Sequence, residues 1–521
     1  MHSTKRVSAI LVGGLVAALL ASCASESTPT PSTSGSTSTS SETPEASGTL
    51  HLGVVTQLAS FAPWEASWAN QSPYLQAVYD TLLRTEPDGT IAPGLATKWE
   101  WNEDRTALTL TLRDNVTFSD GSALTAQLAA DNLLKFRDGT SENASFLAGV
   151  TDVEAKDEHT LVITLAAPDP ALPVYLSQNA GLVGAQAMFD SKDAQTTPIG
   201  SGPYLLDADK TVVGSTWVFE KNPNYWNPED QHYSEIDMTY YADPTALMNA
   251  VKGGQVDAVN AQSPTQSTEA QAAGYLVQTS EQNWVGFLLS DREGKLTPAL
   301  KDVRVRQAFN YALDRQGLLK ALGGGLGTVT TQVFSPNSPA YDPNLDQAYP
   351  YDPEKAKQLL AEAGYPDGFT LKMPSNNFVP ESEFAIYKEQ LGAVGINVEW
   401  EATGDDLFGR VLGGSWSAFS FLLQVDPTAW QTIQFSMLPE SVWNVFHLAD
   451  PKVLELADVV RHGEGDKANT AAQQLNQYIV DEAWYAPVYR PFSAFLTNDK
   501  TEAKLQSDNA VPYLWNIRPA Q

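Results

Sequence analysis

The sequence predicts an α/β fold that is divided into more than one lobe. In "TALTLTL" (106–112) the leucines alternate with threonines, which is the two-residue period of a β-strand, and "TLVITLA" (160–166) repeats this period with Leu161, Ile163 and Leu165. The segment between them, "TAQLAADNLLKF" (125–136), spaces its apolar residues three and four positions apart, as a helix does. About 470 residues follow the N-terminal region, which is more than one hydrophobic core usually holds.

Two later segments predict the clearest helices. "DVRVRQAFNYALDRQGLLKALGGG" (302–325) predicts one continuous helix, capped by Asp302 and ended by the glycines from Gly323. In "DPEKAKQLLAEAGYP" (352–366), Asp352 is placed to cap a helix that ends at Gly364.

The next segments predict a β-α-β unit. "FTLKM" (369–373) and "INVEW" (396–400) have the composition and alternation of strands. Between them, Phe384, Tyr387 and Leu391 lie on one side of a predicted helix. A strand-helix-strand order predicts a parallel pair, which supports the α/β class.

The N-terminus predicts secretion and a lipid anchor. A basic start precedes an apolar stretch over residues 7–22, which ends in Leu-Ala-Ser before Cys23, the only cysteine. This sequence resembles the lipobox of bacterial lipoproteins, so we expect residues 1–22 to be a signal peptide and Cys23 to be acylated. Residues 23–48, rich in Ser, Thr and Pro, predict a disordered tether. The alternative is a cleaved secretory signal with an incidental cysteine.

Composition excludes several classes of function. The net charge of −30 opposes binding to nucleic acid or to anionic lipid. The six histidines are scattered without the spacing of metal ligands, and "GGGLG" (323–327) follows a helix and lacks the lysine of a phosphate-binding loop. No serine nucleophile motif is present. We therefore expect no metal, no cofactor and no enzymatic activity.

Six segments follow one another along the chain, at 95–136, 198–206, 221–228, 251–259, 300–315 and 351–369. They include the hairpin and "LRDNVTFSDG" region, "PIGSGPYLL", "KNPNYWNP" and "VKGGQVDAV". Together and in this order they resemble family 5 extracellular solute-binding proteins, the oligopeptide- and dipeptide-binding subunits of ABC importers.

The resemblance implies a two-lobed fold like that of periplasmic binding proteins, of class II and the large peptide-binding type. Lobe one would comprise 49–283 and 488–521, with an extra subdomain at 90–197, and lobe two 284–487. The lobes would close about a hinge onto the solute, which a membrane permease then receives. The resemblance also implies a monomer at the outer face of the cell membrane, attached only by its lipid.

One segment departs from the pattern of the peptide-binding members. There, an aspartate of lobe two pairs with the α-ammonium group of the ligand. In "SFLLQVDPTAW" (420–430), that position holds Leu423, a preceding aromatic is replaced by Ser420, and the only acid is Asp426. Either Asp426 serves through a shifted loop, or the protein does not hold a free peptide amine in the usual way.

The expected cleft residues come from the two lobe crossings, from this segment and from loops of lobe one. A tryptophan-lined cleft also suits a sugar ring, so an oligosaccharide or another non-peptide solute is an alternative to a peptide. A signalling or adhesion receptor and an extracellular hydrolase are further alternatives. For each aromatic residue the competing interpretation is ordinary packing. The candidates are Trp64, Trp68, Trp284, Trp416, Phe419, Leu423, Gln424, Asp426 and Trp430.

Overall fold

The computed structural model describes residues 48–375, 381–404, 406–424, 426–506, 509 and 511–520. The predicted signal peptide, Cys23 and almost all of the predicted tether lie outside the described residues. Within the described part of the chain, no helix has the length and apolar character needed to cross a membrane.

A mixed sheet of ten strands runs through both lobes. β1 is parallel to β10 and β11, whereas the other pairs are antiparallel. β12 (Leu276–Glu281) and β14 (Gly327–Val329) pair with β18 outside the main path. The order along that path is β17 (Ala418–Gln424), β13 (Asn283–Leu289), β18 (Tyr485–Thr497), β11 (Ala258–Ala261), β1 (Thr49–Val54), β10 (Glu235–Tyr240), β9 (Thr216–Lys221) and β8 (Tyr204–Leu206).

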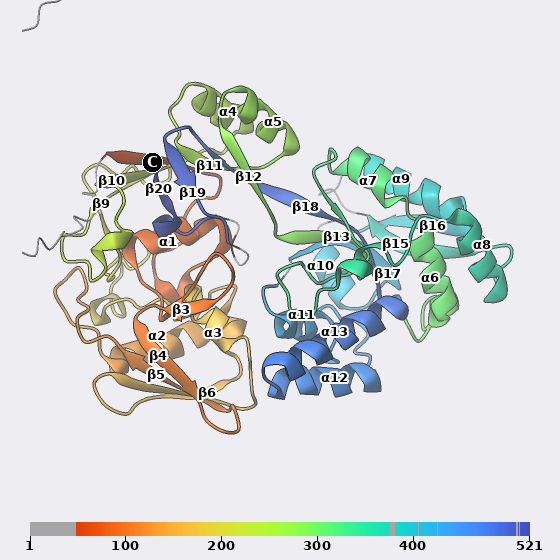
Figure 1. Cartoon of the computed structure of the whole chain (residues 1–521), viewed down its shortest axis with the longest axis horizontal. Helices are drawn as coiled ribbons and strands as arrows, with labels where there is room; N and C mark the ends of the chain where they lie inside the picture. Colours follow the sequence, from red (N-terminus) through yellow and green to blue (C-terminus); the bar gives the residue numbers. More distant parts are fainter. Residues whose placement is uncertain are drawn as a thin grey trace, which may run out of the picture. The chain divides into compact units, whose positions relative to one another are not determined.

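The long strand β18 contains the second boundary expected between the lobes, at 487/488. Its residues 485–491 pair with β13 and β14, and its residues 492–497 pair with β12, the last four also with β11. In Figure 1, β18 accordingly extends from β13 to β12 and β11. On β18, the change of partner strand falls between Pro491 and Phe492. In the partner strands, the chain passes from β12 to β13 at the same level.

Lobe one contains a second, antiparallel sheet of four strands in the order β4 (Ala96–Trp101), β5 (Ala107–Leu112), β7 (Thr160–Leu165) and β6 (Val150–Ala155). The helix α2 (Ala126–Arg137) packs against β6 and β7. Leu108, Leu110 and Leu112 are buried while the threonines between them are more exposed, which confirms the alternation in the sequence.

Short elements complete lobe one and its C-terminal return. The helices are α1 (Ser72–Val78), α3 (Leu172–Tyr175), α4 (Pro244–Lys252) and α5 (Pro264–Ala272). The small strand pairs are β2 (Leu83–Thr85) with β3 (Ile91–Pro93), and β19 (Thr501–Ala503) with β20 (Ile517–Pro519).

Lobe two contains the predicted β-α-β unit. β15 (Phe369–Ser375) and β16 (Ile396–Ala402) are parallel, and α9 (Glu381–Gly392) lies between them in the chain. The ring of Phe287 on β13 lies 5.0 Å from that of Phe309, in the helix α6 (Val303–Tyr311), and 4.7 Å from that of Tyr387 in α9. Both α6 and α9 therefore pack on the sheet. The other helices are α7 (Arg315–Leu322), α8 (Pro353–Glu362), α10 (Leu407–Leu412), α11 (Ala429–Ser436), α12 (Pro451–His462) and α13 (Gly465–Asp481).

The prediction of one helix over 302–322 is wrong, because the chain forms α6 and α7 separately. Asp302 caps α6 as expected, but Asp314 caps a second helix by accepting a hydrogen bond from the amide of Gly317. The buried guanidinium of Arg315 then donates to the carbonyls of Thr330 and Pro487. These tertiary hydrogen bonds offset the loss of helical ones at the break.

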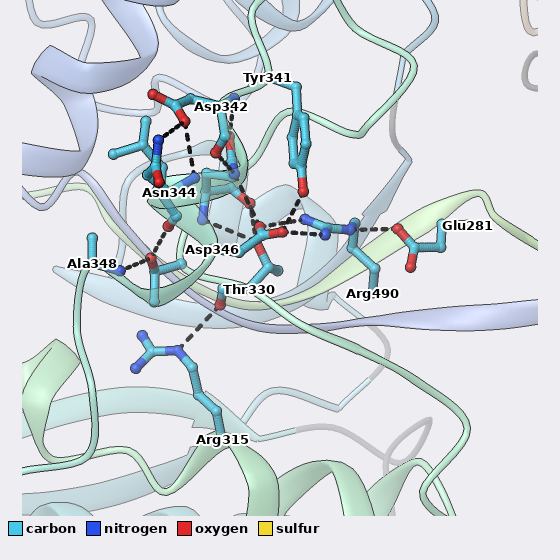
Figure 2. Close-up of polar contacts among 12 residues, drawn as sticks. Glu281, Arg315, Thr330, Tyr341, Asp342, Asn344, Asp346, Ala348 and Arg490 are labelled. Carbon is cyan, nitrogen blue, oxygen red and sulfur yellow. Dashed lines mark hydrogen bonds and ion pairs between the residues drawn. The ribbon is translucent and has the colours of Figure 1, made fainter.

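Where β18 changes partners, its Arg490 is buried in an ion-pair cluster (Figure 2). The guanidinium contacts Glu281 at the end of β12 and Asp346 of lobe two. Asp346 also accepts hydrogen bonds from Tyr341 and Thr330. The cluster therefore ties the end of β12 to lobe two at the strand crossing.

Candidate functional site

Two adjoining cavities share the exposed side chain of Gln424. The first has a volume of about 270 Å³ and is largely aromatic and aliphatic. Its described lining is Trp284, Val333, Phe421, Leu422, Leu423, Gln424, Asp426, Thr432, Phe435, Ser436 and Trp443.

Strand register explains how these side chains meet. Trp284 and Leu423 face each other across β13 and β17, and Asn283 faces Gln424 one position on. Trp284 packs edge-on against Tyr485, with ring centroids 5.9 Å apart. Pairing of the two strands thus brings the first lobe crossing beside the segment that departs from the peptide-binding pattern.

Asp426 is the one charged residue among the described lining of this cavity. The carboxyl is half-buried, and Thr432 Oγ1 donates to its Oδ2 at 3.4 Å. Burial raises the pKa of Asp426 to about 7, and the hydrogen bond from Thr432 only partly opposes this. A cation placed in the cavity would stabilise the ionised carboxylate and be stabilised by it.

The second cavity, also of about 270 Å³, is lined mainly by carboxamides. Gln178 and Gln282 are buried, Asn283 lies at the first lobe crossing, and Gln424 reaches the cavity from lobe two. Its described lining is Trp68, Ala69, Asn70, Glu142, Asn143, Phe146, Gln178, Gln282, Asn283, Gln424 and Asn509. Both lobes therefore contribute to one polar site.

The lobes also contact each other around a third cavity of about 340 Å³, which Trp430 lines. Arg105 Nη1, from the turn between β4 and β5, donates to the carbonyl of Gly463 at 3.1 Å and to Glu464 at 3.0 Å. Arg461 Nε donates to the carbonyl of Pro168 at 2.8 Å. These hydrogen bonds link the four-stranded sheet and its loops to α12 and to the turn that follows it.

A larger cavity of about 500 Å³ has a different position. It lies between α5, the loop after α7 and the middle of β18, and no charged residue is among its described lining. None of the predicted site residues lines it. Its size alone does not make it the ligand site, because specific sites combine apolar walls with placed polar groups.

Comparisons with known proteins show the family to which the chain belongs. The sequence model of the bacterial extracellular solute-binding proteins, family 5 (middle region), matches residues 90–438. The chain belongs to this family. This match confirms the resemblance to family 5 that the six sequence segments show.

Relatives of this family 5 protein have different named ligands. The chain is 30% identical over 307 residues to a nickel-binding periplasmic protein of Escherichia coli, covering 57% of each chain. It is 28% identical over 338 residues to a putative ABC transporter peptide-binding protein of Brucella ovis, covering 62% of this chain and 61% of the relative. These alignments thus span less than two thirds of either relative.

The solved structures confirm the two-lobed α/β fold predicted for a family 5 member. HbpA2 from Haemophilus parasuis superposes with a TM-score of 0.82 over 91% of this chain and 100% of that chain, at 21% identity. At this identity the likeness concerns the fold alone.

The structure distributes the predicted site residues of this family 5 protein over several environments. Trp284, Leu423, Gln424 and Asp426 line the first cavity, Trp68 and Gln424 the second, and Trp430 the third. The other three candidates line none of these cavities.

Those three residues pack instead. Trp64 lies edge-on to Phe189 at 5.5 Å, and Trp416 lies under Arg410 at 4.4 Å from its guanidinium carbon. Phe419 is buried beside Trp443.

Sequence reasoning missed most of the second cavity. Asn143 and Gln178 come from loops of lobe one, where no motif or periodicity distinguishes them. Trp443 was missed although it is one of thirteen tryptophans. Among the described residues, no three His, Cys, Asp or Glu side chains gather as a metal site would require.

Proposed function

We propose that the protein is the substrate-binding subunit of an ABC importer, which captures an amine-bearing solute outside the cytoplasm and delivers it to a permease. An oligopeptide or dipeptide is the first class of ligand to test. Membership of family 5 and the relative named as a peptide-binding protein support this proposal. Capture of this kind breaks no bond in the solute.

The observation that carries the proposal is Asp426 in an aromatic cavity. Its carboxyl lies three residues after Leu423, which occupies the aligned position of the amine-pairing aspartate, and both residues line the same cavity. A ligand ammonium would there gain a charged partner away from bulk water. Asp426 is therefore our candidate for the amine partner.

Binding would close the two lobes about their strand crossings. Residues from both lobes line the second cavity, so a solute in it gains contacts to both at once. A ligand shifts the equilibrium toward the state in which it makes more contacts. We place the lobes at 49–283 with 488–521 and at 284–487, and the hinge near the strand crossings.

The proposed place of action is the outer face of the cell membrane, with the acyl chains on Cys23 as the anchor. The test replaces the cysteine by Cys23→Ser and separates membrane from soluble fractions. We expect the wild-type chain to sediment with membranes and the variant to be released. The same distribution of the wild type and the variant between membrane and soluble fractions would contradict the lipid anchor.

The ligand is tested by denaturing the purified protein and analysing released small molecules by mass spectrometry. We expect an amine-bearing solute. Asp426→Asn should weaken its binding about 30-fold or more, because losing one member of a buried charge pair costs at least about 2 kcal/mol. Asp458→Asn, at an exposed acid of α12, is the matched control and should change nothing.

A second candidate ligand is an oligosaccharide, which Trp284 and Trp443 in the first cavity favour. Flat aromatic faces suit the apolar face of a sugar ring. Unchanged binding in Asp426→Asn together with loss of binding in Trp443→Ala would favour this ligand. Conversion of the released solute on incubation with fresh protein would instead indicate a hydrolase.

A further inference from the structure

The second cavity combines many neutral polar groups with one acid. Glu142 is its only charged residue among those described, and it is exposed at the rim, where its carboxylate accepts a hydrogen bond from Ser67. The first cavity likewise holds only Asp426. The two adjoining cavities therefore carry two acids and, among the described residues, no Arg, Lys or His.

The residues after position 47 that lie outside the described ranges include no basic side chain. They are Asn376, Asn377, Phe378, Val379, Pro380, Asp405, Val425, Ser507, Asp508, Ala510 and Gln521. A carboxylate bound in these cavities would thus lack a basic side chain to pair with, and desolvating it without such a partner is costly.

The polar groups present suit neutral partners. Carboxamides can donate and accept hydrogen bonds, as hydroxyl and amide groups of a ligand can. Asn143 Oδ1 already accepts from Asn179 Nδ2 at 2.9 Å, which fixes its orientation. Gln178 is buried beside the cavity, whereas Gln424 extends from β17 into the space shared by the two cavities.

Two aromatic groups complete the wall. The indole N–H of Trp68 is buried and has no hydrogen-bond partner among the described residues, although Trp68 lines the cavity. An unpaired buried donor is costly unless a ligand or water satisfies it. Phe146 stacks on Tyr175 with centroids 4.4 Å apart, which holds its ring in the wall.

We propose that the cavity lined by Trp68, Asn143, Gln178, Asn283 and Gln424 binds the uncharged hydroxyl- or amide-bearing part of a solute whose ammonium group lies at Asp426. The inference rests on the proposed function and narrows its ligand class. The solute is cationic, not zwitterionic. A short peptide with a free carboxylate is a poor ligand, whereas a carboxyl-blocked peptide or an amino sugar fits.

The test measures affinities of the purified full chain by calorimetry for two matched sets. The first is trialanine as the free acid, the C-terminal amide and the N-acetylated amide. The second is the disaccharide of glucosamine and its N-acetylated form. We expect trialanine amide to bind at least about tenfold more tightly than the acid, a difference of about 1.4 kcal/mol.

The trialanine and glucosamine sets distinguish a peptide from an amino sugar as the solute that carries the ammonium and the neutral polar groups. Tighter binding of the glucosamine disaccharide than of trialanine amide assigns the site to an amino sugar, and the reverse assigns it to a peptide. Binding of the acid equal to or tighter than the amide, or binding of neither set, overturns the inference. Equal binding of free-amine and N-acetylated forms instead overturns the role of Asp426 in the proposed function.

A charge reversal tests whether the second cavity causes the preference for the amide over the free acid. Glu142→Lys supplies the missing cation at an exposed position, so the preference for amide over acid should fall at least about tenfold. Glu142→Gln should give an intermediate ratio. Glu354→Lys, an exposed acid on α8, makes the same charge change away from the cavities and should leave the ratio unchanged. An unchanged ratio in Glu142→Lys overturns the assignment of this cavity.

Discussion

Arg490 and Asp346 form a fork-like ion pair at the strand crossing. Nη1 of Arg490 lies 3.0 Å from Oδ1 of Asp346 and Nη2 lies 2.9 Å from Oδ2, while the side chains are 1% and 12% exposed. Arg490 also contacts Glu281 of β12 (Figure 2). Two parallel hydrogen bonds strengthen a buried ion pair and also fix its geometry.

The first prediction is that Arg490→Ala lowers the free energy of unfolding by about 3 kcal/mol, because it leaves two acids buried without their cation. Denaturant unfolding measures the change. Lys357→Ala removes an exposed partner of Glu354 and should cost less than about 1 kcal/mol. Equal effects of the two substitutions would contradict the structural role of Arg490.

The second prediction concerns pH and ligand affinity. With a pKa of about 7, the Asp426 carboxyl is about 3% ionised at pH 5.5 and about 90% ionised at pH 8. Affinity for a solute with an α-amino group should therefore rise about 15-fold between these pH values, because about half of such amines, with a pKa of about 8, have lost their proton at pH 8. Calorimetry at both pH values measures the change, and Asp426→Asn should abolish it. A flat profile in the wild type would exclude Asp426 as the amine partner.

The third prediction concerns the stability of the ligand-free protein. Because the folded state raises the pKa of Asp426, it binds the proton more tightly than the unfolded chain does. The contribution of this group to stability is therefore present at low pH and is lost as pH rises through about 7. Asp426→Asn should accordingly raise the unfolding free energy at pH 8, on the order of 1 kcal/mol or more, and change it little near pH 4. Destabilisation by this substitution at pH 8 would be the opposite result.

The fourth prediction concerns the contact between the lobes at Arg105. Removing its hydrogen bonds to Gly463 and Glu464 should weaken solute binding about three- to tenfold, because the substitution disfavours the state in which both lobes touch the ligand. Arg105→Ala is compared with Lys98→Ala, which removes an exposed partner of Glu100 on the same sheet. Equal affinities in the two variants would show that this contact has no part in closure.

The fifth prediction concerns Gly200, which lies in the segment "PIGSGPYLL". A Cβ at this position would lie 1.9 Å from the carbonyl oxygen of Val78, so the backbone itself would have to move. Gly200→Ala should destabilise the protein by about 1–3 kcal/mol. Thermal unfolding measures the change. Gly149→Ala is the matched control and should change stability little, because a Cβ there would meet no atom within 4 Å.

The sequence was most informative where local chemistry decides the structure. Asp352 caps α8 by accepting from the amide of Lys355, and the chain turns at Gly364 with φ of 92°, as the residue types predict. The break between α6 and α7 could not be predicted in the same way. It depends on Arg315 reaching carbonyls of Thr330 and Pro487, which are distant in the chain.

The same distinction applies to the candidate site. Leu423, Gln424 and Asp426 lie in one segment with a recognisable departure from a family pattern, and all three line the first cavity. Asn143 and Gln178 meet them only through the folding of lobe one. Isolated carboxamides carry no periodic or spaced signal, so sequence reasoning had no means to select them.

Small-angle X-ray scattering with and without solute tests the central claim most directly, since it compares the lobe arrangement of the wild type with that of Asp426→Asn. We predict that the solute recovered from the protein reduces the radius of gyration of the wild type and leaves that of the variant unchanged at the same concentration. A radius of gyration that is the same with and without saturating solute in the wild type would contradict capture by lobe closure.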